Sequence, residues 1–136
     1  MMTSSVSTVA DHMRRDVASV SPEVDAYEAI NLLLTHHVSA LPVITDDGSL
    51  AGILSERACL EAFISAEYYG SSPQFVRDLM TEEVVSVAHD ADIMKVAALF
   101  SQKKFHHFPV LQNGRLVGQI SRRGVIRALD RMRRSG

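Results

Sequence analysis

The sequence has little of what marks extracellular and membrane proteins. Its 136 residues include one cysteine, Cys59, so no disulfide can form within the chain and nothing indicates an oxidising compartment. No window reaches the ~18 apolar residues of a membrane span. The N-terminal stretch MMTSSVSTVADHMRR also lacks the apolar core of a secretory signal. We therefore expect a cytoplasmic protein without a membrane span.

The chain also has no large excess of one charge sign, because its formal net charge is only -2. With 46% hydrophobic and 22% charged residues, the composition is that of a packed globular domain. The charges are unevenly placed, however: residues 122–134 carry six arginines and one acid, Asp130. This pattern predicts an amphipathic helix with a solvated basic face. Nucleic-acid binding is disfavoured because no aromatic platform accompanies the arginines, whereas a protein partner or a second subunit remains open.

One pattern of residues occurs twice. VSALPVITDDGSLAGILS (residues 38–55) and FHHFPVLQNGRLVGQIS (residues 105–121) have the same order of residue types. Identities recur at a shift of 67 residues and, after one residue is dropped in the turn, at a shift of 66. They include Val9 with Val76, Met13 with Met80, Asp25 with Asp92, Pro42 with Pro109, Gly52 with Gly118 and Ser55 with Ser121. The chain is therefore an internal duplication.

Each copy predicts the same small set of elements. A short β-branched strand (residues 17–20 and 84–87) precedes a helix capped by Asp25 or Asp92. Two strands follow, joined by Asp-Gly or Asn-Gly, dipeptides that favour a tight hairpin. A second helix begins after Ser55 and Ser121.

The sequence therefore predicts an α+β fold of two β-α-β-β-α repeats. One such unit is too small to cover its own sheet, so we expect the copies to cover each other. The expected organisation is an N-terminal segment (1–8), a first repeat (9–65), a connection (66–75), a second repeat (76–131) and a basic C-terminal tail (132–136).

The doubled pattern, with SALPV before the first hairpin, AGILSER closing it and VGQISRR in the second copy, resembles a pair of cystathionine β-synthase (CBS) domains. The resemblance covers about residues 9–129. It implies two repeats packed about a pseudo-two-fold axis and further association into a homodimer. It also implies a regulatory, energy-sensing type of role, in which AMP, ADP, ATP or another adenosyl ligand binds between the repeats and changes the behaviour of an effector protein.

The resemblance also implies site residues. For the cleft closed by Ser121 they are Met13, Ala18, Ser39, Ala40, His106, His107, Gln119, Ser121, Arg122, Arg123 and Gly124. For a second, weaker cleft they are Met80, Val85, Ile53, Ser55 and Ala58. From the residues themselves, each serine begins a helix, where free backbone N–H groups favour an anion; the simpler interpretation is that each serine only caps its helix.

The two copies depart from the family pattern at one position. Three residues after the serine the family has an aspartate that accepts hydrogen bonds from the ribose hydroxyls, and here Ala58 and Gly124 occupy that place. Hydrogen bonds to a charged group contribute about 1.5 to 3 kcal/mol each, so a nucleoside would bind roughly a hundredfold more weakly. Arg122 and Arg123 instead favour phosphate, so we expect one occupied cleft per chain at most.

Other kinds of site fit the sequence poorly. His36-His37 and His106-His107 are adjacent pairs whose side chains diverge, so neither pair readily chelates one metal ion. Cys59 and the two helix-starting serines have no base at motif spacing, which argues against an enzyme. Two hypotheses remain: a ligand sensor needing no cofactor, and a ligand-free module for dimerisation and protein docking.

Overall fold

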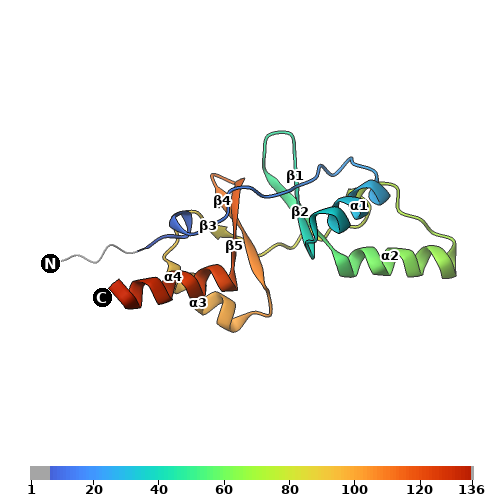
Figure 1. The fold of residues 1–136 in the computed structure, drawn as a ribbon. Helices are drawn as coiled ribbons and strands as arrows, with labels where there is room; N and C mark the ends of the chain where they lie inside the picture. Colours follow the sequence, from blue (N-terminus) through green and yellow to red (C-terminus); the bar gives the residue numbers. More distant parts are fainter. Residues whose placement is uncertain (1–6, 136) are drawn as a thin grey trace. The chain divides into compact units, whose positions relative to one another are not determined.

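The computed structural model describes residues 7–135, which form two compact units (Figure 1). The first unit is Ala18–Val84. The second unit consists of residues 7–17 together with residues 85–135. Each unit has its own apolar core.

The first unit contains helix α1 (Ala26–His36), strands β1 (Ala40–Ile44) and β2 (Leu50–Ser55), helix α2 (Glu56–Tyr69) and the short 3-10 helix η2 (Val76–Asp78). The strands pair antiparallel, and Val20 adds a single parallel bridge to Val43. The buried stripe of α1 packs with the hairpin into one core. Its members are Val20, Ala29, Ile30, Leu33, Leu41, Val43, Leu54, Cys59 and Val76.

The second unit repeats this arrangement. It contains the 3-10 helix η1 (Val9–Asp11), strand β3 (Val87–Ala88), helix α3 (Ile93–Gln102), strands β4 (His107–Gln112) and β5 (Arg115–Ser121) and helix α4 (Arg122–Ser135). The sheet order is β3-β4-β5, with β3 parallel to β4 and β4 antiparallel to β5. Phe108 of β4 stacks on Phe100 of α3 at a centroid distance of 4.4 Å in the core of this unit.

The compact units do not coincide with the two sequence repeats, because the repeats exchange their first segments. The segment before the first repeat's helix packs on the second repeat: Val9 N donates to Ala91 O at 3.0 Å. The corresponding segment of the second repeat packs on the first, where Val76 N donates to Val24 O at 2.9 Å. Val9 and Val76 are each fully buried in the unit formed mainly by the other repeat.

Most predicted elements are present with shifted ends. Asp25 and Asp92 cap α1 and α3 by accepting backbone N–H bonds, and Gly48 and Gly114 have the positive φ that the hairpins require. The predicted strand at 17–20 is wrong, since only Val20 makes a bridge, and the strand predicted at 84–87 is instead Val87–Ala88.

The second helix of each repeat is longer than the sequence pattern indicates. Helix α2 continues to Tyr69, four residues into the segment expected to be a connection, and ends at Gly70 with φ 66°. Helix α4 continues to Ser135 and takes in most of the expected basic tail. Apolar periodicity ends earlier than either helix, because the last turns are exposed on all sides.

Candidate functional site

The start of helix α4 is organised by Ser121. Its Oγ accepts a hydrogen bond from Gly124 N at 2.9 Å, which satisfies one of the free N–H groups of the first turn. Ser55 does the same for Ala58 N at 3.1 Å at the start of α2. Both serines therefore cap their helices, as the simpler interpretation predicts. Each hydroxyl can still take part in another hydrogen bond, because its oxygen has a second lone pair and its O–H is a donor.

Arg122 is held by a histidine of the preceding strand region. Its Nη2 lies 2.8 Å from His106 Nδ1, and its backbone N donates to His106 O at 3.0 Å. Since a guanidinium only donates, Nδ1 of His106 must be the unprotonated acceptor in this contact. The histidine thus orients a cation at the positive end of the helix without neutralising it.

His107 is half-buried and lies opposite Ser121 in the β4–β5 pairing. Burial is the main cause that lowers the pKa of the His107 imidazole below its usual value of 6.5, and a smaller electrostatic contribution from the adjacent His106 acts in the same direction. His107 is therefore a neutral side chain in the folded protein near neutral pH. It can offer a hydrogen bond at this position but not a positive charge.

This shift predicts a loss of stability in acid. The unfolded chain binds a proton at His107 more readily than the folded chain does. The contribution of neutral His107 to the free energy of unfolding is therefore complete above about pH 6.5, and it is lost as the pH falls through the lower pKa of the folded state. We expect His107→Gln to flatten this part of the denaturation profile between pH 7.5 and pH 5. His36→Gln, at the exposed end of α1, is the control for replacing a histidine by glutamine elsewhere in the chain. An unaltered slope in His107→Gln would contradict the assignment.

Gln119 and Met13 are brought together by the exchanged segment. Arg14 N donates to Gln119 O and Gln119 N donates to Arg14 O, both at 2.9 Å. Gly118, beside Gln119 on β5, lets Met13 lie against the strand: a Cβ built there would be 2.7 Å from Met13 Sδ. The first unit repeats the arrangement with Ile53, Thr81, Gly52 and Met80.

The predicted site residues divide between the units as follows. The second unit contains Met13, His106, His107, Gln119, Ser121, Arg122, Arg123 and Gly124, together with Val85 of the weaker cleft. The first unit contains Ala18, Ser39 and Ala40, together with Ile53, Ser55, Ala58 and Met80 of the weaker cleft. Within the second unit, the contacts at α4 connect Ser121, Arg122, His106 and Gly124 directly.

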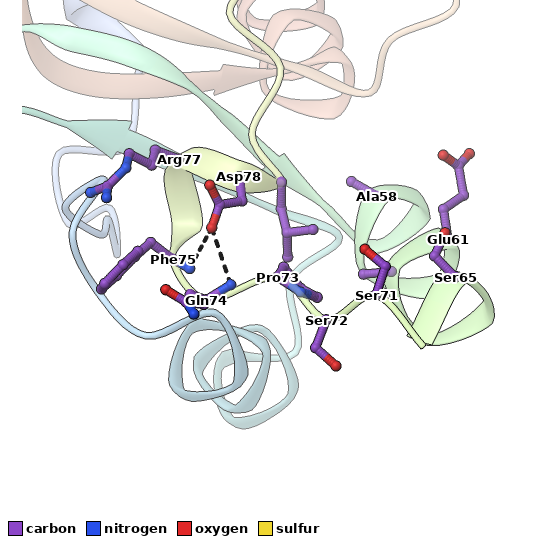
Figure 2. A pocket seen from close by; sticks show the side chains of 12 residues that line it. Ala58, Glu61, Ser65, Ser71, Ser72, Pro73, Gln74, Phe75, Arg77 and Asp78 are labelled. Atoms are coloured by element: carbon purple, nitrogen blue, oxygen red, sulfur yellow. Dashed lines mark hydrogen bonds between the residues drawn. The ribbon is translucent and has the colours of Figure 1, made fainter. Parts of the chain in front are cut away.

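The first unit also has a groove that sequence reasoning missed. The groove lies between α2 and the segment leading into η2 and has a volume of about 650 Å³. Figure 2 shows the side chains that line it. It is lined by Ala58, Glu61, Ala62, Ser65, Ser71, Ser72, Pro73, Gln74, Phe75, Arg77, Asp78 and Leu79. Only the Gly, Ser and Pro content of residues 70–73 hinted that a polar surface follows α2.

The charged side chains at this groove make contacts within the chain. Asp78 accepts bonds from Phe75 N at 2.9 Å and Gln74 N at 3.1 Å, and these bonds lower the pKa of its carboxyl (Figure 2). Glu61 pairs with Arg57 at 3.3 Å, and the Arg77 guanidinium lies 4.4 Å from the centroid of the Phe75 ring. The groove therefore offers hydroxyl and amide groups more than a free charge.

Neither a metal-binding cluster nor a membrane-spanning helix occurs among the described residues. Among residues 7–135, no group of three or more histidine, cysteine, aspartate or glutamate side chains is placed to hold a metal ion. In the same part of the chain, no helix has the length and apolarity needed to cross a bilayer.

Two α+β repeats that exchange their first segments, each with a serine-capped second helix, define a tandem-repeat fold, and comparison with known sequences gives its family. The profile of the CBS domain matches residues 6–65 and 76–131. The chain belongs to the CBS-domain family and carries a pair of these domains.

Its relatives include stand-alone CBS proteins. It is 30% identical over 116 residues to the CBS domain-containing protein YhcV of Bacillus subtilis, covering 85% of this chain and 81% of YhcV. The chain also resembles CBSX2, a CBS-pair protein of Arabidopsis thaliana whose structure was solved in complex with AMP. The two sequences are 30% identical, the TM-score is 0.79, and the match covers 93% of this chain and 98% of the CBSX2 chain.

Some relatives are much longer than this chain. It is 28% identical over 114 residues to inosine-5'-monophosphate dehydrogenase of Methanocaldococcus jannaschii. The match covers 83% of this chain but only 22% of that enzyme, so it concerns the shared CBS region.

Proposed function

We propose that this CBS pair is a cytoplasmic regulatory module that binds an adenine nucleotide, or another phosphorylated adenosyl ligand, and transmits its occupancy to an effector protein. The observation that carries the proposal is the start of α4. There Ser121 caps the helix and Arg122 and Arg123 follow, and neither arginine has an ion-pair partner within residues 7–135. A helix start with two uncompensated guanidinium groups favours a phosphate.

The relatives support the ligand class. CBSX2 is described in complex with AMP and resembles this chain over nearly its whole length. The ligand would meet Met13, His106, His107, Gln119 and the start of α4, which all belong to the second unit. No catalytic step and no bound cofactor belong to the proposal, and we expect the functional form to be a homodimer.

The two copies would differ in affinity. At the start of α2, Glu56 occupies the position that Arg122 has in α4. Arg57 forms an ion pair with Glu61, in which Arg57 Nε lies 3.3 Å from Glu61 Oε1. A phosphate at Ser55 would therefore meet a neighbouring carboxylate and no free arginine. This asymmetry supports one ligand per chain, held at the Ser121 side.

Isothermal titration with AMP, ADP and ATP tests the proposal. We expect one binding event per chain, and loss of detectable binding in Arg123→Ala, because the guanidinium holds the phosphate. Arg57→Ala is the matched control, since Arg57 occupies the same position in the first repeat and should leave binding unchanged. Two equal, tight sites per chain would contradict the proposed asymmetry.

The second candidate function is a ligand-free module for dimerisation and protein docking. It is favoured by one observation: Ala58 and Gly124 both lack the carboxylate that would hold a ribose. A thermal-shift screen separates the two functions, because a ligand at 100 times its Kd adds about 2.7 kcal/mol of stability. No shift with any nucleotide or nucleotide-derived cofactor would favour the docking module.

A further inference from the structure

The solvent-facing side of helix α4 carries a row of arginines. Three of them, which we call the arginine stripe, are Arg127, Arg131 and Arg134. At 3.6 residues per turn, these positions fall within about 60° of the helix surface. All three side chains are exposed, whereas Val125 and Ala128 of the same helix are buried in the core of the second unit. The stripe therefore faces away from the core.

The charge of the arginine stripe is only partly neutralised by the chain. Among residues 7–135, only Arg134 of the stripe makes an ion pair, with Asp130 at 3.1 Å. Asp130 also pairs with Arg133 at 2.8 Å, so one carboxylate is shared by two arginines. The stripe therefore keeps a net positive charge.

The fold itself does not require these arginines. The matching positions of α2 are Glu61, Ser65 and Tyr68. Helix α2 nevertheless buries its corresponding side, where Cys59 and Ala62 lie. A charge pattern that one copy has and the other lacks is not needed for the shared fold, so it points to a partner outside the chain.

We propose that the arginine stripe binds an acidic segment of the effector protein. The inference rests on the proposed regulatory function for the existence of an effector, and it adds the chemistry by which the effector is recognised. The stripe spans about 10 Å along the helix axis, and side chains four residues apart on a helix lie about 6 Å from each other. Carboxylates at similar spacing can each accept two parallel hydrogen bonds from a guanidinium.

The stripe also begins next to the proposed ligand site. Arg123, which is proposed to hold the phosphate, lies one helical turn before Arg127. An effector segment on the stripe would therefore approach the end of the helix at which the ligand binds.

Two other anionic partners fit this surface less well. The rest of the chain has eight basic and fifteen acidic residues, a net charge of -7, so it repels a long polyanion such as nucleic acid. A bilayer is disfavoured because α4 buries Val125 and Ala128 in the core, which leaves the stripe side without apolar residues that could enter the interface. A short acidic segment meets neither obstacle.

Fluorescence anisotropy with a labelled peptide tests the proposal. The probe is a helical peptide with glutamate at every fourth position, and a second peptide has glutamine at these positions. We expect the full chain to bind only the glutamate peptide. Arg127→Gln with Arg131→Gln should weaken this binding by about fivefold to tenfold, since exposed ion pairs contribute modestly.

A matched variant controls for net charge. Lys104→Gln with Arg115→Gln removes the same charge from exposed positions of the same unit, and it should leave the affinity for the peptide unchanged. Equal loss of affinity in the two double variants, or no binding of the glutamate peptide to the unsubstituted chain, would overturn the proposal.

Further measurements separate the other possible occupants. Tighter binding of duplex DNA or of phosphatidylserine vesicles at the same salt concentration would overturn the proposal in favour of that partner. A changed oligomeric state of the Arg127→Gln, Arg131→Gln variant would instead assign the stripe to a contact between copies. The affinity of this variant for AMP should be unchanged, because neither arginine belongs to the Ser121 site, so a failure here is distinct from a failure of nucleotide binding.

Discussion

Replacing Gly118 with alanine is expected to lower the free energy of unfolding by about 3 kcal/mol. A Cβ at this position of β5 would lie 2.6 Å from Arg14 O and 2.7 Å from Met13 Sδ. Real Cβ atoms do not approach so closely, so the exchanged segment would have to move away from the strand. The two bonds between Arg14 and Gln119, each 2.9 Å, would then lengthen or break.

Chemical denaturation and hydrogen exchange test this expectation together. The melting temperature should fall by roughly 10 °C. The amides of Arg14 and Gln119 should exchange faster, while those of Ile53 and Thr81 in the first unit keep their protection. Gly52→Ala should show the converse, because its Cβ would lie 2.7 Å from Thr81 O.

A glycine with a different constraint serves as the control. Gly70 ends α2 with φ 66°, and a Cβ there would meet nothing within 4 Å. Gly70→Ala therefore costs only the backbone strain of a positive φ, about 1 kcal/mol. If Gly118→Ala were no more destabilising than Gly70→Ala, the close approach of the segment would not be what stabilises this unit.

Gly52 and Gly118 also separate the parts of the fold that the sequence predicts from the parts that it does not. Gly52 and Gly118 fall at matching positions of two strands, and a glycine inside a strand often marks a close backbone approach. The duplication, the capping aspartates and the hairpins also follow from local patterns, because turns and caps depend on residues near in sequence. Which segment approaches each glycine depends on contacts between distant residues, so the exchange of segments was not predicted.

The candidate site was predictable to a similar degree. Ser55 and Ser121 precede their helices as expected, because capping is a local property. The contact between Arg122 and His106 was not expected, since the two residues are 16 positions apart and meet only through the hairpin. The groove beside α2 was missed for the same reason: it forms where the helix packs near residues 71–79.

Introducing aspartate at Gly124 is expected to raise the affinity for adenosine nucleotides by about a hundredfold. Position 124 lies in the first turn of α4, where its backbone N donates to Ser121 Oγ at 2.9 Å. A carboxylate here would stand beside the proposed phosphate site and could accept hydrogen bonds from both ribose hydroxyls. It is also favoured by the positive end of the helix dipole.

The local structure has room for this side chain. A Cβ at position 124 would lie 3.2 Å from Ser121 Oγ and 3.6 Å from Ile120 Cδ1, so a small shift of the serine hydroxyl accommodates it. Gly124→Ala adds the same Cβ without the carboxylate, and it should leave the affinity near that of the unsubstituted chain. Ala58→Asp makes the matched change beside Glu56 and should gain much less, because that helix start has no free arginine.

Titration with AMP and 2'-deoxy-AMP separates ribose recognition from a general effect on folding. If the carboxylate binds both hydroxyls, Gly124→Asp should prefer AMP over the deoxy form, whereas Gly124→Ala should not discriminate. Hydrogen bonds to a charged group contribute about 1.5 to 3 kcal/mol each, so losing one hydroxyl should cost roughly tenfold or more. An unchanged affinity for AMP in Gly124→Asp would show that the start of α4 does not face a ribose, and the ligand would then have to be a phosphorylated molecule held by charge alone.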